Sequence, residues 1–158
     1  MQTQIHITVP YEPTPKARPR ARAFMVGKQI RTQVYNPTKT TNAEVFIRDY
    51  LITHGIEIMR DCPLYVLAIF YRTRPKHLPK RVTLPIQKPD LDNYEKLVLD
   101  ACEKFAYEND SQITTKVTAK RFADPGKTPR IELFIEIDRG AIPLRDITPH
   151  PLELVPAV

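Results

Sequence analysis

The chain contains few of the cysteines whose disulfides stabilise small secreted proteins. Its 158 residues include only two cysteines, Cys62 and Cys102, and four glycines. Because Cys102 falls on an apolar helical stripe described below, this cysteine usage indicates reduced thiols in a cytosolic protein. No segment is long or apolar enough to span a membrane, and the N-terminus lacks the apolar region of a signal peptide. These absences predict a soluble cytoplasmic protein.

Glycine-rich phosphate loops and internal repeats are also missing from the sequence. Acidic residues are in the minority, since 24 lysines and arginines face 18 aspartates and glutamates and give a formal net charge of +6. Such a charge allows a nucleic-acid partner without proving one. At 158 residues, we expect one compact domain whose core needs no disulfides.

The most informative stretch is K-P-D-L-D-N-Y-E-K, residues 88–96, which holds two carboxylates, an amide and an ammonium group. Pro89 disfavours helical geometry at Lys88, so the acids are expected to follow an extended approach. In an extended segment the side chains of Asp90 and Asp92 would point the same way. Two like charges this close repel each other, which indicates a hard divalent cation between them. We therefore interpret this stretch as the core of a Mg²⁺ site.

A helix is predicted directly after these acids, with Asp92 as its N-cap and Glu95 completing a capping-box-like pattern. Lys96 lies one turn past Asp92 and points back toward the helix start. A simpler alternative is that the two acids only cap this helix and that Lys96 is a solvated charge. The helix itself is indicated by one apolar stripe, formed by Tyr94, Leu97, Val98, Ala101, Cys102 and Phe105.

A third acid follows the helix in the turn N-D-S-Q, residues 109–112. The next residues, 113–120, alternate between apolar and polar side chains and predict a strand with one buried face, formed by Ile113, Thr115, Val117 and Ala119. A helix that returns the chain to a neighbouring strand could bring Asp110 alongside Asp90 and Asp92. The alternative is that Asp110 is only a turn residue.

The chain contains a specific combination of motifs and residues: D-x-D-N-x-x-K at 90–96, Asp100-Ala101, N-D-S-Q-I at 109–113, Lys120, P-K-A-R-P-R at 15–20 and Tyr35-Asn36-Pro37. This set resembles the RusA family of Holliday-junction resolvases, which are common in phages and prophages. The similarity runs from about Ile5 to Ile137. One difference is that the family usually has paired acids before the Q-I turn, whereas Asn109 occupies the first of these positions here.

The resemblance implies a Mg²⁺-dependent endodeoxyribonuclease, with Mn²⁺ as a possible substitute, that acts in DNA recombination and repair. It implies Asp90, Asp92 and Asp110 as metal ligands and Lys96 as the catalytic lysine. Resolving a four-way junction needs paired symmetric cuts, so the resemblance also implies a homodimer. Two other functions stay open: a nuclease for other branched DNA, and a non-catalytic basic DNA-binding accessory protein.

Two basic, proline-broken segments are the expected DNA contacts. The first, residues 11–39, is read as a loop whose cations could engage successive phosphates, and the second covers residues 72–81 beside the acidic stretch. A solvated charged face is the alternative for the first segment. Phe24, Met25 and Tyr35 could stack on bases, although anchoring the loop is favoured. The predicted DNA-binding residues are Lys16, Arg18, Arg20, Arg22, Arg31, Arg72, Arg74, Lys76 and Lys120.

The remaining patterns predict an α+β domain over residues 1–139, with a mixed β-sheet flanked by helices. Its expected elements are a strand over 5–9, a helix over 40–54, a central strand over 64–71, the helix after Asp92 and strands over 113–120 and 131–137. Residues 140–158 contain four prolines and several aliphatic residues, which predict an extended tail.

Overall fold

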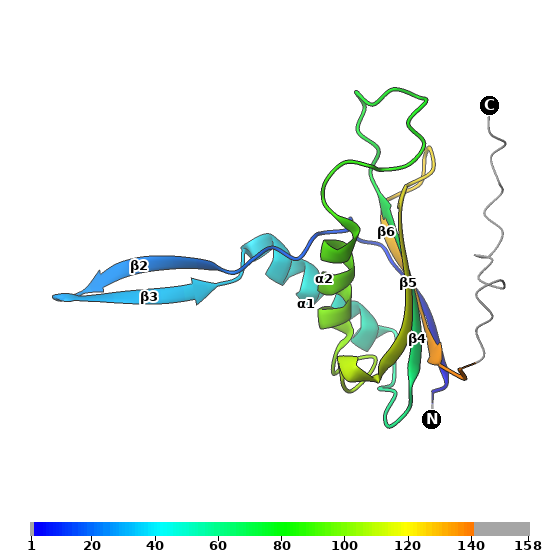
Figure 1. The fold of residues 1–158 in the computed structure, drawn as a ribbon, viewed down its shortest axis with the longest axis horizontal. Helices are drawn as coiled ribbons and strands as arrows, with labels where there is room; N and C mark the ends of the chain where they lie inside the picture. Colours follow the sequence, from blue (N-terminus) through cyan, green and yellow to red (C-terminus); the bar gives the residue numbers. More distant parts are fainter. Residues whose placement is uncertain (1, 141–158) are drawn as a thin grey trace.

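The computed structural model describes residues 2–140, so the predicted tail lies outside the described residues apart from Gly140. Figure 1 shows the helices on one face of a sheet and a hairpin that projects from the body. The elements are β1 (Gln4–Val9), β2 (Arg20–Val26), β3 (Gln29–Tyr35), α1 (Thr38–Thr53), β4 (Leu64–Arg72), α2 (Leu91–Cys102), the short 3-10 helix η1 (Asp110–Gln112), β5 (Ile113–Phe122) and β6 (Arg130–Ile137).

The main sheet has four strands in the order β1-β6-β4-β5. Strand β6 pairs antiparallel with β1 and β4, whereas β4 and β5 are parallel. Parallel neighbours need a crossover connection, and α2 provides it between β4 and β5. The predicted mixed sheet, the α+β class and the central position of residues 64–71 are therefore confirmed.

The hydrophobic core lies between one face of this sheet and the two helices. On α2 the predicted stripe is buried from Tyr94 to Cys102, while Phe105 lies beyond the helix end and is half-buried. On α1 the buried apolar residues are Ala43, Ile47 and Leu51. The sheet contributes Ile5, Ile7, Val9, Leu64, Val66, Ala68, Phe70, Ile131, Leu133 and Ile135.

Strand β5 differs from its predicted pattern. In the parallel register Lys116, Thr118 and Lys120 lie beside core residues of β4, so these polar side chains take the face toward the helices. The side expected to be buried, which includes Val117 and Ala119, lies on the opposite face and is half-buried. The reason is that β5 is an edge strand, and its polar side chains bond to α2 and the loop before it.

The segment read as a basic loop contains the hairpin of β2 and β3. These strands pair from Arg20 to Tyr35 across a turn at Gly27 and Lys28, and Gly27 has φ +62°. Every residue of both strands is exposed. The prolines that indicated a loop leave a gap between Pro19 and Pro37, and the chain alternates polar and small or apolar residues within that gap. We call this hairpin, residues 20–35, the arm.

Lys16 connects the segment before the arm to both helices. Its backbone N–H donates to the carbonyl oxygen of Asn93 at 2.7 Å, and its ammonium group pairs with Glu44 and, at 2.8 Å, with Asp100. Burial would lower the pKa of Lys16, but the hydrogen bonds and charges of Asp100 and Glu44 outweigh it and raise the pKa. Lys16 therefore links the two helices, and its ammonium group is engaged with the protein's own carboxylates.

We expect Lys16→Gln to lower the free energy of unfolding by about 2 kcal/mol, because two carboxylates lose a charged hydrogen-bond partner. Urea unfolding followed by circular dichroism measures this change. The matched control is Arg18→Gln, two residues along the chain at an exposed position, with an expected change within about 0.5 kcal/mol. Equal stability of Lys16→Gln and the native protein would contradict this role.

Candidate active site

Asp90 and Asp92 lie at the N-terminal end of α2. The helix begins at Leu91, so Asp90 is the N-cap, with φ −71° and ψ 152°, and Asp92 is in the first turn. The prediction of Asp92 as the N-cap is therefore wrong, and the extended geometry expected for both acids ends at Asp90. Both side chains are exposed, and the N-terminus of a helix attracts negative charge.

Although Asp90 occupies the N-cap position, neither acid caps the helix with its side chain. The side chain of Asp90 makes no capping hydrogen bond, and the ion pairs within residues 2–140 involve neither Asp90 nor Asp92. Glu95 does not complete a capping box, because its carboxylate pairs with Lys116 and accepts a hydrogen bond from the hydroxyl of Thr118 at 3.1 Å. Two carboxylates without a protein partner suit a hard divalent cation such as Mg²⁺.

The backbone that leads to Asp90 is held by two cations from the ends of β4 and β5. The Nζ atom of Lys120 donates to the carbonyl oxygens of Gln87 at 3.1 Å and Pro89 at 2.9 Å. The Nη1 atom of Arg72 donates to the carbonyl oxygen of Lys88 at 3.1 Å. These bonds fix the three residues before Asp90, so Lys120 and Arg72 position the acidic site.

Arg74 holds the earlier part of the same loop. Its guanidinium donates to the carbonyl oxygens of Val82 at 2.6 Å and Pro79 at 2.7 Å, and it lies 5.0 Å from the ring centre of Phe122. The predicted DNA contacts Arg72, Arg74 and Lys120 are thus engaged with the protein's own backbone. Lys76, in the same loop, is exposed.

Asp110 lies at the other end of α2. It is the first residue of η1, directly before β5, and the loop that carries Asp90 reaches the opposite end of β5 at Lys120. Figure 1 shows the chain entering α2 at one end of the sheet and reaching η1 at the other. The 12 residues of α2 separate the two ends by about 18 Å.

The expected cluster of three acids is therefore not formed within one chain. Residues 2–140 contain no group of three histidine, cysteine, aspartate or glutamate side chains placed to hold a metal ion. The prediction was wrong because the chain that leaves α2 enters β5 at the start of that strand, next to Asp110. Asp90 and Asp92 instead lie near the other end of β5, beside Lys120.

The turn around Asp110 is built by its neighbours. The side-chain oxygen of Asn109 accepts a hydrogen bond from the backbone N–H of Ser111 at 2.9 Å. The side-chain oxygen of Gln112 accepts from the N–H groups of Glu108 and Asn109, both at 2.9 Å. Asn109 and Gln112 therefore form the capping box, and the exposed carboxylate of Asp110 is not needed for it.

Lys96 is exposed on α2, one turn after Asp92. The ion pairs found within the described part of the chain do not involve it, so its ammonium group is available to a ligand near the two acids. Cys102, by contrast, is fully buried at the far end of the helix, and burial raises the pKa of its thiol to about 12. Cys102 is therefore a core residue and not a nucleophile.

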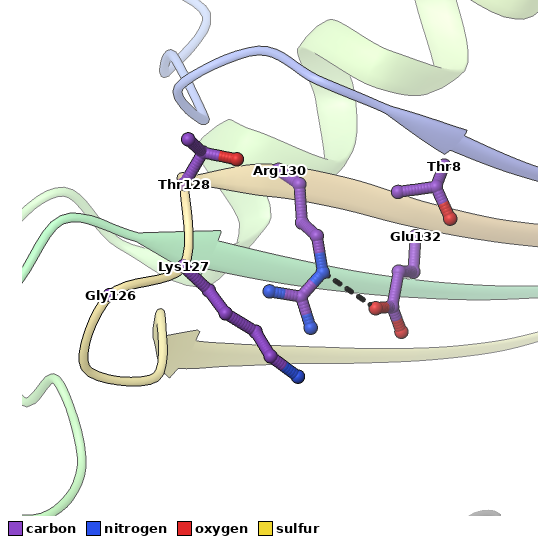
Figure 2. Close-up of a pocket in the computed structure, with 6 residues that line it drawn as sticks. All are labelled: Thr8, Gly126, Lys127, Thr128, Arg130 and Glu132. Carbon is purple, nitrogen blue, oxygen red and sulfur yellow. Dashed lines mark hydrogen bonds and ion pairs between the residues drawn. The ribbon is translucent and has the colours of Figure 1, made fainter.

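A pocket of about 470 Å³ lies on the sheet face away from the helices (Figure 2). Among its lining residues, the carboxylate of Glu132 accepts a hydrogen bond from Nε of Arg130 at 2.8 Å. This pocket has no second carboxylate in its lining, so the acids at the start of α2 remain the candidate site. The lining consists of Thr8, Gly126, Lys127, Thr128, Arg130 and Glu132.

Comparison with known proteins gives two matches. The family model described as "Endodeoxyribonuclease RusA" matches residues 10–136, a range that contains Asp90, Asp92, Lys96 and Asp110. "Uncharacterized protein YqaN" from Bacillus subtilis (strain 168) is 28% identical over 141 residues, which cover 83% of this chain and 94% of that protein. Neither helix of the described chain is long and apolar enough to cross a membrane.

We expect Lys120→Met to loosen the loop over residues 79–89. Losing two hydrogen bonds to its backbone should increase the rate of trypsin cleavage at Lys80 and Arg81 several-fold. The matched control is Lys116→Met on the same strand, because Lys116 pairs with Glu95 and does not touch this loop. Mass spectrometry of the early fragments measures both rates, and an unchanged rate in Lys120→Met would contradict the positioning role.

Proposed function

This chain belongs to the RusA family of endodeoxyribonucleases, and from that premise we propose that it is a Mg²⁺-dependent enzyme that resolves Holliday junctions. It would do so by paired, symmetric hydrolysis of phosphodiester bonds in DNA recombination and repair, in the cytoplasm. The observation that supports this most is the pair of unengaged carboxylates, Asp90 and Asp92, at the start of α2. Lys96 stands one turn further along the same helix.

Asp90 and Asp92 would hold the metal ion, Mg²⁺ or in its place Mn²⁺. When bound, such an ion activates a water molecule and stabilises negative charge on the phosphate. The protein's contribution is to present the two carboxylates on a rigid helix end, with the preceding backbone held by Lys120 and Arg72. This support matters because an active site needs its ligands positioned to a fraction of an ångström.

Lys96 would act on the phosphate itself. Its ammonium group can stabilise the charge that develops on the phosphate oxygens or donate a proton to the leaving oxygen. The backbone N–H groups of the first turn of α2 add partial positive charge at the same place. These groups together favour a phosphodiester over a neutral substrate.

Asp110 would complete the site of a second copy of the chain. It is exposed, its turn is capped by Asn109, and α2, about 18 Å long, lies between it and the acids of its own chain. A four-way junction has near-two-fold symmetry, so a two-fold dimer would present two equivalent sites to it. Each site of such a homodimer would combine Asp90 and Asp92 of one copy with Asp110 of the other.

The DNA contacts that remain proposed are the exposed cations. Arg20, Arg22 and Arg31 lie on the arm, Arg18 precedes it and Lys76 lies in the loop beside the acidic site. Contacts of this kind bind phosphates without reading the base sequence. They fit a substrate that is recognised by its branched shape.

We expect Asp92→Asn to reduce cleavage of a synthetic four-way junction at least 100-fold while junction binding persists, because a metal ligand is lost and the fold is not. The assay compares labelled junction and matched linear duplex with Mg²⁺, and chelation of the metal should stop cleavage by the native protein. Asp49→Asn, an exposed acid on α1, is the control and should cut as the native protein does.

The two alternative functions give different results in the same assay. A nuclease for other branched DNA would cut flaps or forks faster than four-way junctions. A non-catalytic DNA-binding protein would bind without Mg²⁺ and give no product with Mg²⁺ or Mn²⁺. Either result would replace the proposed function.

We expect a mixture of Asp92→Asn and Asp110→Asn proteins to nick junctions although each variant alone does not. In a mixed dimer one site would contain both substitutions, whereas the other would contain neither. The expected product is therefore a single-strand nick without the paired cut. Subunit exchange is checked with a size-tagged copy. If exchange occurs and no nicks form, Asp110 does not act on the other copy's site.

A further inference from the structure

The loop that leads to the acidic site, residues 79–89, carries two large apolar side chains in water. Leu84 is 51% exposed, and Ile86, at 81%, is the most exposed large apolar residue of the described chain. Pro85, between them, is buried. Single exposed apolar residues are common on protein surfaces, but two that flank a buried residue are held out by the fold. We call Leu84 and Ile86 the apolar pair.

The backbone on both sides of the apolar pair is fixed by side chains from the sheet. Before the pair, the guanidinium of Arg74 donates to the carbonyl oxygens of Pro79 at 2.7 Å and Val82 at 2.6 Å. After the pair, Nζ of Lys120 donates to the carbonyl oxygen of Gln87 at 3.1 Å. A loop that is already ordered loses little conformational entropy when it binds a partner. The apolar pair is therefore prepared for contact.

The apolar pair also lies close to the acids along the chain. Ile86 precedes Asp90 by four residues, so their Cα atoms are at most about 14 Å apart. Figure 1 shows this loop, in green, extending beyond the end of the sheet and returning to the start of α2. Nucleotides along a strand are spaced by about 3.4 Å, so Ile86 reaches bases within about four nucleotides of a phosphate bound at Asp90.

The charges around the apolar pair restrict what it contacts. Residues 72–89 contain six lysines and arginines and no acidic residue. Four of these cations are exposed, namely Lys76, Lys80, Arg81 and Lys88. A nucleic-acid strand offers both matching chemistries, because its phosphates are anionic and the faces of its bases accept apolar side chains. An anionic bilayer offers them too, but the place of the pair beside the acidic site favours DNA.

Base faces are accessible only where stacking is interrupted. Separating two stacked bases inside a linear duplex is costly, whereas the stack is already broken or weakened where strands exchange at a branch point. An apolar side chain that enters such a gap buries its surface and keeps the gap open. Side chains of this kind next to the metal site would therefore favour branched DNA over linear duplex.

We propose that Leu84 and Ile86 pack against base faces beside the cleaved phosphate and hold the strands of a branched DNA apart. This inference rests on the proposed function for its substrate. It adds to that function the residues by which the site selects unstacked DNA. The apolar pair takes no part in the chemistry, and its role is to determine specificity.

The test follows base stacking with 2-aminopurine, which fluoresces more strongly when it is unstacked. The base is placed in turn at the four nucleotides beside the branch point of a synthetic four-way junction. Ca²⁺ replaces Mg²⁺, so that binding is measured apart from cleavage. At saturating protein we expect the native chain to raise the fluorescence several-fold at one of these positions. Leu84→Ser with Ile86→Ser should lose at least half of this rise and, with Mg²⁺, cut the junction at least 10-fold more slowly.

Two control variants accompany the measurement. Ile52→Ser replaces another exposed isoleucine, 60% exposed on α1, and should leave the fluorescence and the cleavage rate unchanged. Ile86→Leu should keep the rise, because the contact needs an apolar side chain and not a particular shape. All the replaced side chains are exposed, so circular dichroism should show native folding in each variant. Should the double variant bind too weakly to saturate, Ile86→Ser alone is judged by the same criteria.

An unchanged rise in the double variant would overturn the inference. It would do so equally if that variant lost self-association or binding to anionic vesicles, since the pair would then contact protein or lipid. A native chain that binds junctions without any rise would overturn it as well. Junction cleavage by the native chain is scored separately. Cleavage with an unchanged rise in the double variant refutes only the base contact, whereas a rise that depends on the apolar pair without cleavage refutes only the nuclease.

Discussion

The packing of α2 along the sheet determines where the candidate site residues lie. The buried stripe from Tyr94 to Cys102 holds the helix against the core over its whole length, so its two ends cannot approach each other. Asp90 and Asp92 stand at one end and Asp110 near the other. A protein with three acids that act together must then either bend this helix, which its burial opposes, or bring in the third acid from another molecule. The same rigidity that separates the acids also makes the helix end a precise support for two of them.

The basic residues divide into two groups by their partners. Lys16, Arg72, Arg74 and Lys120 bond to carboxylates or backbone carbonyls of the chain itself. Three of these four hold the loop over residues 79–89, which has little regular structure to hold it and which ends at Asp90. The exposed cations of the arm and Lys76 form the second group, and they are the ones free to meet phosphates. The positive charge therefore partly serves the fold, and only the exposed part of it is available to the proposed DNA surface.

Two features of the structure bear on the proposed second copy. One is geometric, because α2 lies between Asp110 and the acids of its own chain. The other is hydrophobic, because Met25, Ile30 and Val34 are exposed on the arm. A junction with two-fold symmetry would use such a dimer well, since each copy would supply ligands to both sites and arginines to the same DNA. Dimerisation would then be a condition for catalysis and not only a way to double the number of sites.

The sequence by itself determined the features that depend on local periodicity and composition. The stripe of α2, the central strand β4 and the mixed α+β class follow from residue spacing, because burial of one face repeats along the element. The two acids and Lys96 as site residues stay a prediction from the sequence, and the N-cap lies two residues earlier than expected. Only the tertiary structure decided that residues 20–35 form an arm, that β5 turns its polar side to the helices, and that Asp110 lies far from Asp90 and Asp92. These outcomes depend on which strands pair and on the direction in which α2 crosses the sheet. Both are set by contacts between residues far apart in the chain, which residue spacing does not reveal.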